Sequence, residues 1–101
     1  MILYEVNVTV QPQIESEYRA WLKTHIAEML EHQGFIRAEV YEPTEKITDQ
    51  IEITMHYFLD SQESMDSYLK NHAPRMREIG LKLFKDQFSA TRRILELIYS
   101  S

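Results

Sequence analysis

The chain has 101 residues and a mass of 12.1 kDa, which suits one domain and leaves no room for a second. Its formal net charge of −5 repels phosphate backbones and anionic lipids, so we expect neither nucleic acid nor a membrane as a partner. The lack of cysteine excludes disulfide bonds and thiolate metal sites, and no signal peptide or apolar run of membrane-spanning length is recognisable, so a cytoplasmic location is expected.

Residues 2–10 alternate between apolar and mixed positions, which predicts a strand. The apolar positions are Ile2, Tyr4, Val6, Val8 and Val10. From Gln13 onward the apolar residues recur every three or four positions, which is the spacing of an amphipathic helix. Gly34 suits the left-handed residue that follows a helix, so we expect a helix of about 20 residues that ends at this glycine.

Two further strands are predicted at residues 35–42 and 51–60, joined by the polar stretch 43–50. In the first of them, the pattern directs Ile36, Ala38 and Val40 toward the core. In the second, one apolar row faces the core and the opposite row is mixed in character. The mixed row comprises Glu52, Thr54, His56, Phe58 and Asp60.

Two helical segments are predicted between residues 60 and 84. Asp60 precedes Glu63 by three residues, the spacing of an N-terminal capping box with aspartate in the capping role. Pro74 lacks a backbone donor and disfavours helical geometry at Ala73, so we expect a break there. Residues 88–100 are assigned as a strand because a strand completes the arrangement.

The resulting order is β-α-β-β-α-β over a single domain that spans residues 1–101. Right-handed crossovers place both helices on one face of a four-stranded antiparallel sheet. The predicted fold class is therefore α+β with the ferredoxin-like topology. This arrangement covers only one face of the sheet.

The other face carries aromatic rings together with ionisable groups. Its predicted members are Glu5, Asn7, Thr9, Phe35, Arg37, Glu39, Tyr41, Glu52, Thr54, His56, Phe58 and Arg92. A sheet face in water favours Lys, Glu and Thr, whereas the rings argue against full exposure. A symmetric homodimer that packs two such faces together would cover them, and the alternative is a monomer that exposes this face.

Three segments carry a family resemblance: "MILYEVNV" at the start, "HIAEMLEHQGF" at the end of the first predicted helix, and "YLKNHAPRMRE", in which "NHAP" is the most specific piece. They resemble an uncharacterised bacterial family of short proteins, a domain-of-unknown-function group within the dimeric α+β barrel superfamily. The resemblance covers essentially the whole chain. It implies a ferredoxin-like subunit that pairs sheet to sheet as a dimeric α+β barrel, and it implies no activity.

The cleft of such a dimer is the predicted ligand-binding site. Its candidate residues are Asn7, Arg37, Glu39, Tyr41, His56 and Arg92. His56 has two interpretations. Beside carboxylates in a closed cleft it would act as a general base or hold a ligand carbonyl. Alternatively, it belongs to a network with neighbouring arginines and carboxylates that fixes the register of the dimer, with Arg37, Glu39, Glu52 and Arg92 as its expected members.

The other histidines fall on predicted helices. One side of the first helix carries His25, Glu28 and His32, as a metal site would. However, His25 lies between Trp21 and Met29 on the apolar face. A hydrogen-bonded core histidine is the preferred interpretation, and we expect no metal. His72 and its neighbour Asn71 adjoin the predicted helix break, where the preferred role of either side chain is to satisfy freed backbone groups. The alternative for His72 is a place at a pocket rim.

Three functions remain open at this point. The preferred one is a homodimeric small-molecule-binding protein without assigned chemistry, and a purely structural or protein-binding dimer is another. The superfamily resemblance implies the third, a cofactor-independent monooxygenase or isomerase. Haem-degrading relatives resemble the chain at Asn7, but Phe58 and Glu78 stand where their tryptophan and histidine would be, so no cofactor is expected. RNA recognition is excluded by the missing aromatic motif and the net charge.

Overall fold

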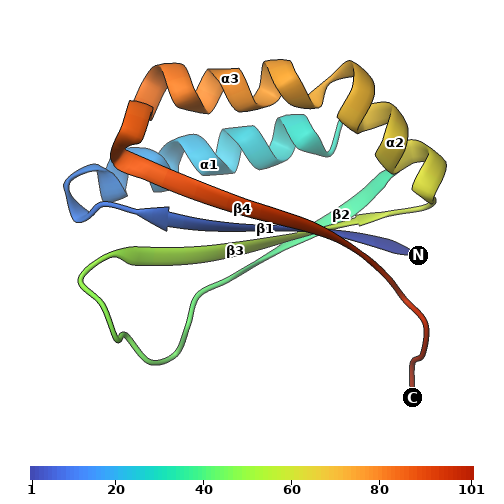
Figure 1. Cartoon of the computed structure of the whole chain (residues 1–101), viewed down its shortest axis with the longest axis horizontal. Helices are drawn as coiled ribbons and strands as arrows, with labels where there is room; N and C mark the ends of the chain where they lie inside the picture. Colours follow the sequence, from blue (N-terminus) through green and yellow to red (C-terminus); the bar gives the residue numbers. More distant parts are fainter.

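The computed structural model describes residues 1–101 and shows a four-stranded antiparallel sheet covered on one face by three helices (Figure 1). The strands are β1 (Ile2–Val10), β2 (Phe35–Tyr41), β3 (Ile51–Leu59) and β4 (Phe88–Glu96). The helices are α1 (Glu15–Met29), α2 (Gln62–Asn71) and α3 (Ala73–Phe84). The strand order β2-β3-β1-β4 confirms the predicted ferredoxin-like α+β fold, including the strand assigned to the last stretch.

The hydrophobic core lies between the sheet and the helices. Alternate side chains of β1 and β3 point into it, and Leu59 is completely buried there. Tyr68 of α2 lies with its ring centroid 5.2 Å from that of Phe35, and Tyr18 of α1 lies 5.2 Å from Phe84 of α3. Burial of a large apolar side chain contributes about 1.5–3 kcal/mol. Contacts of this kind hold all three helices on one face of the sheet.

The start of α2 differs from the prediction in one respect. Ser61, and not Asp60, is the N-cap: its hydroxyl oxygen accepts a hydrogen bond from the backbone N–H of Ser64. The Asp60 carboxylate instead accepts a hydrogen bond from the Ser64 hydroxyl at 2.7 Å. The predicted break is confirmed, because α2 and α3 are separate helices on either side of His72, two residues before Pro74.

The first helix is shorter than predicted. A 3₁₀ turn at Pro12–Ile14 precedes α1, which has 15 residues and ends at Met29. An irregular turn then leads to Gly34, whose φ of 90° confirms the predicted left-handed glycine. This irregular turn consists of residues that the apolar spacing in the sequence had assigned to the end of the helix.

A β-bulge corrects the predicted alternation at the start of β2. Phe35 is opposite Leu59 and Arg37 is opposite Phe58, so Ile36 is an extra residue between two register positions. Phe35 is therefore buried on the helix side, and Ile36 is exposed instead of pointing inward. From Arg37 onward the predicted alternation holds.

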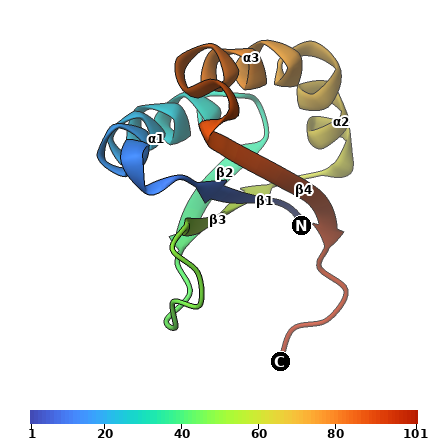
Figure 2. The same cartoon turned by 60° about the vertical axis from the view of Figure 1, so that its left-hand side comes forward.

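The second face of the sheet carries no helix, and we call it the open face. Figure 2 shows that the connection between β2 and β3 (green) and the C-terminal residues 97–101 (red) extend away from the helices on this side. None of the helices combines the length and the apolar character that a bilayer span requires.

Replacing Gly34 with Ala is expected to lower the free energy of unfolding by more than about 1 kcal/mol. The backbone there is left-handed, and an added Cβ would overlap the side chain of Ser64 at the start of α2. Chemical denaturation measures the change, with Gln33→Ala at the exposed neighbouring position as the control. An unchanged midpoint for Gly34→Ala would contradict this packing of the turn against α2.

Candidate functional site

The register of the sheet arranges the open face in three rows that cross all four strands, in the order β2, β3, β1, β4. The charged row consists of Glu39, His56, Glu5 and Arg93. The polar row on one side of it consists of Tyr41, Thr54, Asn7 and Thr91. The apolar row on the other side consists of Arg37, Phe58, Leu3 and Leu95. Acids and bases alternate along the charged row.

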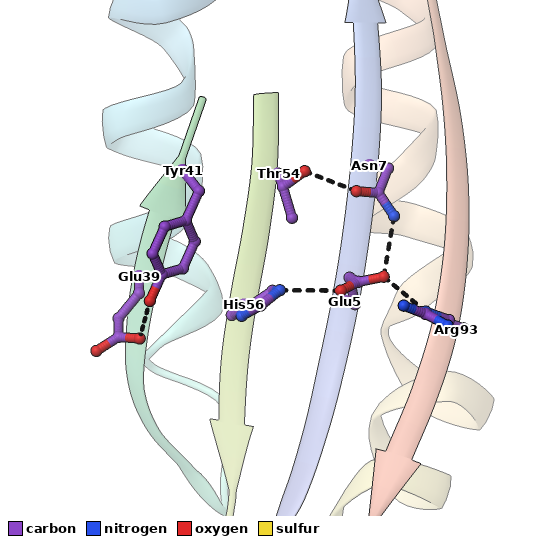
Figure 3. A network of polar contacts seen from close by, with 7 residues as sticks. All are labelled: Glu5, Asn7, Glu39, Tyr41, Thr54, His56 and Arg93. Carbon is purple, nitrogen blue, oxygen red and sulfur yellow. Dashed lines mark hydrogen bonds and ion pairs between the residues drawn. The ribbon is translucent and has the colours of Figure 1, made fainter. Parts of the chain in front are cut away.

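Glu5 lies at the centre of the charged row and is the one buried charged residue of the chain, with an exposed fraction of 8%. Its Oε1 accepts hydrogen bonds from Arg93 Nε at 2.7 Å and from Asn7 Nδ2 at 3.1 Å (Figure 3). Its Oε2 lies 2.9 Å from His56 Nε2. Thr54 Oγ1 extends the network with a hydrogen bond to Asn7 Oδ1 at 2.6 Å. No helix covers this side of the sheet, so it is the neighbouring side chains that bury the carboxylate.

These donors hold the pKa of the Glu5 carboxyl at about 2, well below its ordinary value. The hydrogen bond from Arg93 is the largest cause and that from Asn7 follows, whereas desolvation acts in the opposite direction. A carboxylate partner also favours a proton on Nε2 of His56. Glu5 is thus an ionised group whose oxygens are already satisfied within one chain.

A second cluster lies on β2 and the adjacent part of β3. The Tyr41 hydroxyl donates to Glu39 Oε1 at 2.6 Å, and Arg37 forms an ion pair with the same carboxylate. The contact with Tyr41, followed by that with Arg37, lowers the pKa of Glu39. The guanidinium carbon of Arg37 lies 3.9 Å from the ring centroid of Phe58, a cation–π contact. The ring centroids of Tyr41 and His56 are 5.1 Å apart, so this cluster also contacts the histidine of the charged row.

Five of the six predicted cleft residues share the open face: Asn7, Arg37, Glu39, Tyr41 and His56. The sixth, Arg92, was placed wrongly. It is opposite Val6 and lies on the helix side, where it borders a small cavity between the sheet and the helices. Arg93, opposite Glu5, stands on the open face instead. A shift of one residue exchanges the two faces of a strand, and the pattern of the last stretch was too irregular to decide the register.

Glu5 and Arg93 were not predicted as site residues, although they form the centre of the network. Glu5 belonged to the predicted open face, so its cross-strand neighbours could have been found from a correct register. The expected proximity of Glu39 to His56 is present in the register, yet the His56 ring pairs with Glu5 on the other side. The network therefore runs through β1, the central strand next to both β3 and β4.

An apolar recess of about 380 Å³ lies at one end of the open face. It is lined by Met1, Leu3, Arg37, Phe58, Leu95, Glu96 and Leu97. The whole apolar row therefore contributes to its wall. Its volume falls in the range of about 300–1,000 Å³ that is common for small-molecule pockets.

His25 packs on Trp21, with ring centroids 4.5 Å apart and nearly parallel planes. Burial lowers the pKa of His25 to about 4, so the ring is neutral at pH 7. Its Nδ1 is buried and has no hydrogen-bond partner within the chain, which corrects the expectation of a hydrogen-bonded core histidine. No group of three or more metal-binding side chains occurs in the chain.

The helix break at His72 is satisfied by the main chain. The His72 N–H donates to the Tyr68 carbonyl at 2.9 Å, and the His72 carbonyl accepts from the Met76 N–H at 3.1 Å. The His72 ring lies 4.5 Å from the ring of His32. The Asn71 side chain donates to the Ser67 hydroxyl, so neither side chain has the backbone-capping role that was preferred for it.

The family model described as domain of unknown function DUF4286 matches residues 1–98. The chain belongs to the DUF4286 family. This membership confirms the resemblance to an uncharacterised family that the three sequence segments carried. No curated protein sequence matches the chain significantly.

Solved structures share the fold of this DUF4286 chain at low sequence identity. A mutant form of SnoaB, a cofactor-independent oxygenase from Streptomyces nogalater, has a TM-score of 0.71 and 11% identity over 98% of this chain and 95% of its own. A protein from Deinococcus radiodurans, provisionally named an antibiotic biosynthesis monooxygenase, has a TM-score of 0.78 and 12% identity over 100% and 96% of the two chains. A dimeric ferredoxin-like protein from an uncultured marine organism has a TM-score of 0.71 and 12% identity over 99% and 97%. Such identities show the fold alone.

Glu5→Gln is expected to lower the free energy of unfolding at pH 7 by about 1–2 kcal/mol, because a neutral amide forms weaker hydrogen bonds with Arg93 and His56. The pKa of Glu5 is depressed in the folded state, so its contribution to stability is complete above about pH 4.5 and is lost as the pH falls through about 2. Urea titrations should show the difference between wild type and variant shrinking over that range.

Glu52→Gln is the matched control, since Glu52 is an exposed carboxylate of the same face outside the network. It is expected to change the free energy of unfolding by less than about 0.5 kcal/mol. Equal effects of the two substitutions, or a Glu5→Gln effect that stays constant down to pH 2, would contradict the role assigned to Glu5.

Proposed function

We propose that this chain forms a homodimer through its open face and that the dimer binds a small molecule in the cleft between its two sheets. One observation supports the proposal above all others. The open face holds both a buried, ionised carboxylate and an apolar recess, and no other layer of the same chain covers them. A surface that is half ionic and half apolar suits contact with a second surface of the same kind.

The charged row can be buried at low cost because its groups are already paired. An unpaired ion taken out of water costs several kcal/mol. Glu5 has three partners and Glu39 has two in the single chain, so a covering surface need not supply any. The adjacent apolar row offers Leu3 and Leu95, whose burial would favour association.

The order of charges along the row favours one symmetry. If the two-fold axis runs parallel to the strands, the charged row of one copy lies over the charged row of the other in reversed order. Glu39 then faces Arg93 of the second copy, and His56 faces Glu5. An axis perpendicular to the strands would place Glu39 over its own equivalent and thus bring like charges together. The proposed dimer therefore has its axis along the strands, with β2 of one copy over β4 of the other.

The ligand would occupy the recess and the cleft beside it. A second copy laid over the open face encloses the recess, whose lining is apolar except for Arg37 and Glu96. The charged and polar rows flank it and provide hydrogen-bonding groups. We therefore propose an apolar ligand with at least one polar group, and we retain as its contacts Asn7, Arg37, Glu39, Tyr41 and His56.

A cofactor-independent monooxygenase or isomerase is the second candidate. The observation that favours it is the 2.9 Å contact between His56 Nε2 and the Glu5 carboxylate, since a carboxylate that orients a histidine supports general-base catalysis. The names of two structures with this fold point to oxygenase chemistry in those proteins. A bound ligand that wild-type protein converts in air, and that His56→Asn protein binds without conversion, would favour this candidate over simple binding.

Phe58→Glu is expected to convert the dimer to a monomer, because it places one carboxylate from each copy in the apolar part of the proposed interface. Sedimentation velocity measures the state at equal protein concentration. Leu81→Glu is the matched control, since Leu81 is exposed on α3 on the other side of the molecule. A wild type that stays monomeric at millimolar concentration would contradict the proposal, as would a control that dissociates equally.

The recess is expected to bind a neutral aromatic probe such as indole. Met1 lines the recess, whereas Met65 is a buried core residue of α2, so their ¹³C-methyl resonances report on the recess and on an unrelated site. Titration with indole should shift the Met1 methyl saturably and leave the Met65 methyl in place. Leu95→Glu should abolish the shift, and a saturable response that survives this substitution would contradict binding in the recess.

A further inference from the structure

A small cavity lies on the helix side of the sheet, where the proposed function leaves it unused. Its volume is about 40 Å³, and its walls come from β1, β3, β4 and all three helices. The Tyr57 hydroxyl and His25 Nδ1 are the two buried side-chain polar atoms without a hydrogen-bond partner in the chain, and both residues line this cavity. Buried polar groups are nearly always paired, so two unpaired ones at one cavity indicate a missing partner.

The charges around the cavity have one sign. Arg77 and Arg92 line it, and no acidic residue does. Arg77 donates a hydrogen bond to the Tyr4 hydroxyl at 3.1 Å, and neither arginine forms an ion pair. The chain has 16 acidic and 11 basic residues, so the positive lining of this cavity contrasts with the negative net charge of the whole molecule.

The unpaired groups can all donate hydrogen bonds. Burial raises the pKa of Tyr57, and although the charge of Arg92 acts in the opposite direction, the hydroxyl stays protonated at pH 7. The neutral ring of His25 can carry its proton on Nδ1. Arg92 supplies a guanidinium, whose fork geometry matches a carboxylate. A partner that satisfies such a set accepts hydrogen bonds and carries negative charge.

The size of the cavity limits the partner. An engineered cavity of about 150 Å³ holds one benzene molecule, so 40 Å³ admits a group of a few atoms and excludes a ring. The thioether chains of Met29, Met55 and Met76 form much of the wall and can adjust to a small guest. Arg92 itself is exposed, so a longer ligand can extend past it into solvent.

We propose that this cavity binds the carboxylate head of a small organic acid, with Arg92, Tyr57 and His25 as its hydrogen-bond donors. The site is separate from the dimer cleft because the two lie on opposite faces of the sheet. Formate and acetate are the smallest ligands of the class. The proposal stands or falls independently of dimer formation.

Methionine methyl NMR tests the proposal in the full chain. Met29, Met55 and Met76 line the cavity, whereas Met1 lines the open-face recess and Met65 lies elsewhere in the core. Titration with sodium formate or sodium acetate is expected to shift the resonances of the three cavity methyls saturably. Sodium chloride at equal ionic strength should leave these resonances in place. Absence of a saturable shift, or an equal response to chloride, would overturn the carboxylate assignment.

Arg92→Gln is expected to raise the Kd for acetate at least tenfold, because it removes the charged donor. Arg75→Gln, at an exposed arginine of α3 outside the cavity, should leave the Kd within twofold of wild type. Tyr57→Phe should weaken binding severalfold without lowering the melting temperature, since the hydroxyl has no partner to lose.

Binding that is unchanged in Arg92→Gln and Tyr57→Phe would place acetate elsewhere and refute the site. A response of Met1 to indole with no response of the cavity methyls to acetate would refute this site alone.

Discussion

The open face depends on one constraint: a carboxylate on the bare side of a single sheet must find its partners across the strands. Glu5 does so on both sides, with His56 on β3 and Arg93 on β4. A shift of either neighbouring strand by one residue would turn its partner to the other face. The ionic network therefore fixes the same register that aligns Leu3, Phe58 and Leu95 in the apolar row.

The two faces of the sheet differ in whether their polar groups have hydrogen-bond partners within the chain. On the open face the acids and bases satisfy one another, which allows the face to be covered without new partners. On the helix side, Tyr57 and His25 each have a buried polar atom that the chain leaves unpaired. Satisfied charge suits assembly, whereas unsatisfied donors suit a ligand. This contrast is why we assign dimer formation to one face and a carboxylate site to the other.

Much of the fold could be predicted from the sequence because long strands with strict alternation and a glycine after a helix have one simple interpretation. The errors fall where that pattern is locally broken. The bulge at Ile36 places Phe35 on the helix side, and no residue type in this stretch predicts a bulge of this kind. In the last strand, Arg92 and Arg93 are adjacent and identical in type, so only the observed register shows which of them reaches the open face. The cap at Ser61 was missed because Asp60 beside it fits the same motif.

The candidate site was predictable as a surface but not as a network. Alternation placed Asn7, Glu39 and His56 on one face, but the partner of each depends on which strands are neighbours and in which register. The helix-side cavity was not predictable, because it arises where side chains of six elements fail to fill a space.

Isotope-filtered nuclear Overhauser measurements on a mixture of ¹³C-labelled and unlabelled chains detect only contacts between copies, so they show which face of the sheet pairs in the dimer. The proposed dimer should give contacts from the Tyr41 ring on β2 to the Thr91 methyl on β4, and from the Phe58 ring to Leu3. Contacts between copies that arise instead from Leu81 and Leu83 on α3, or no such contacts at millimolar concentration, would contradict it.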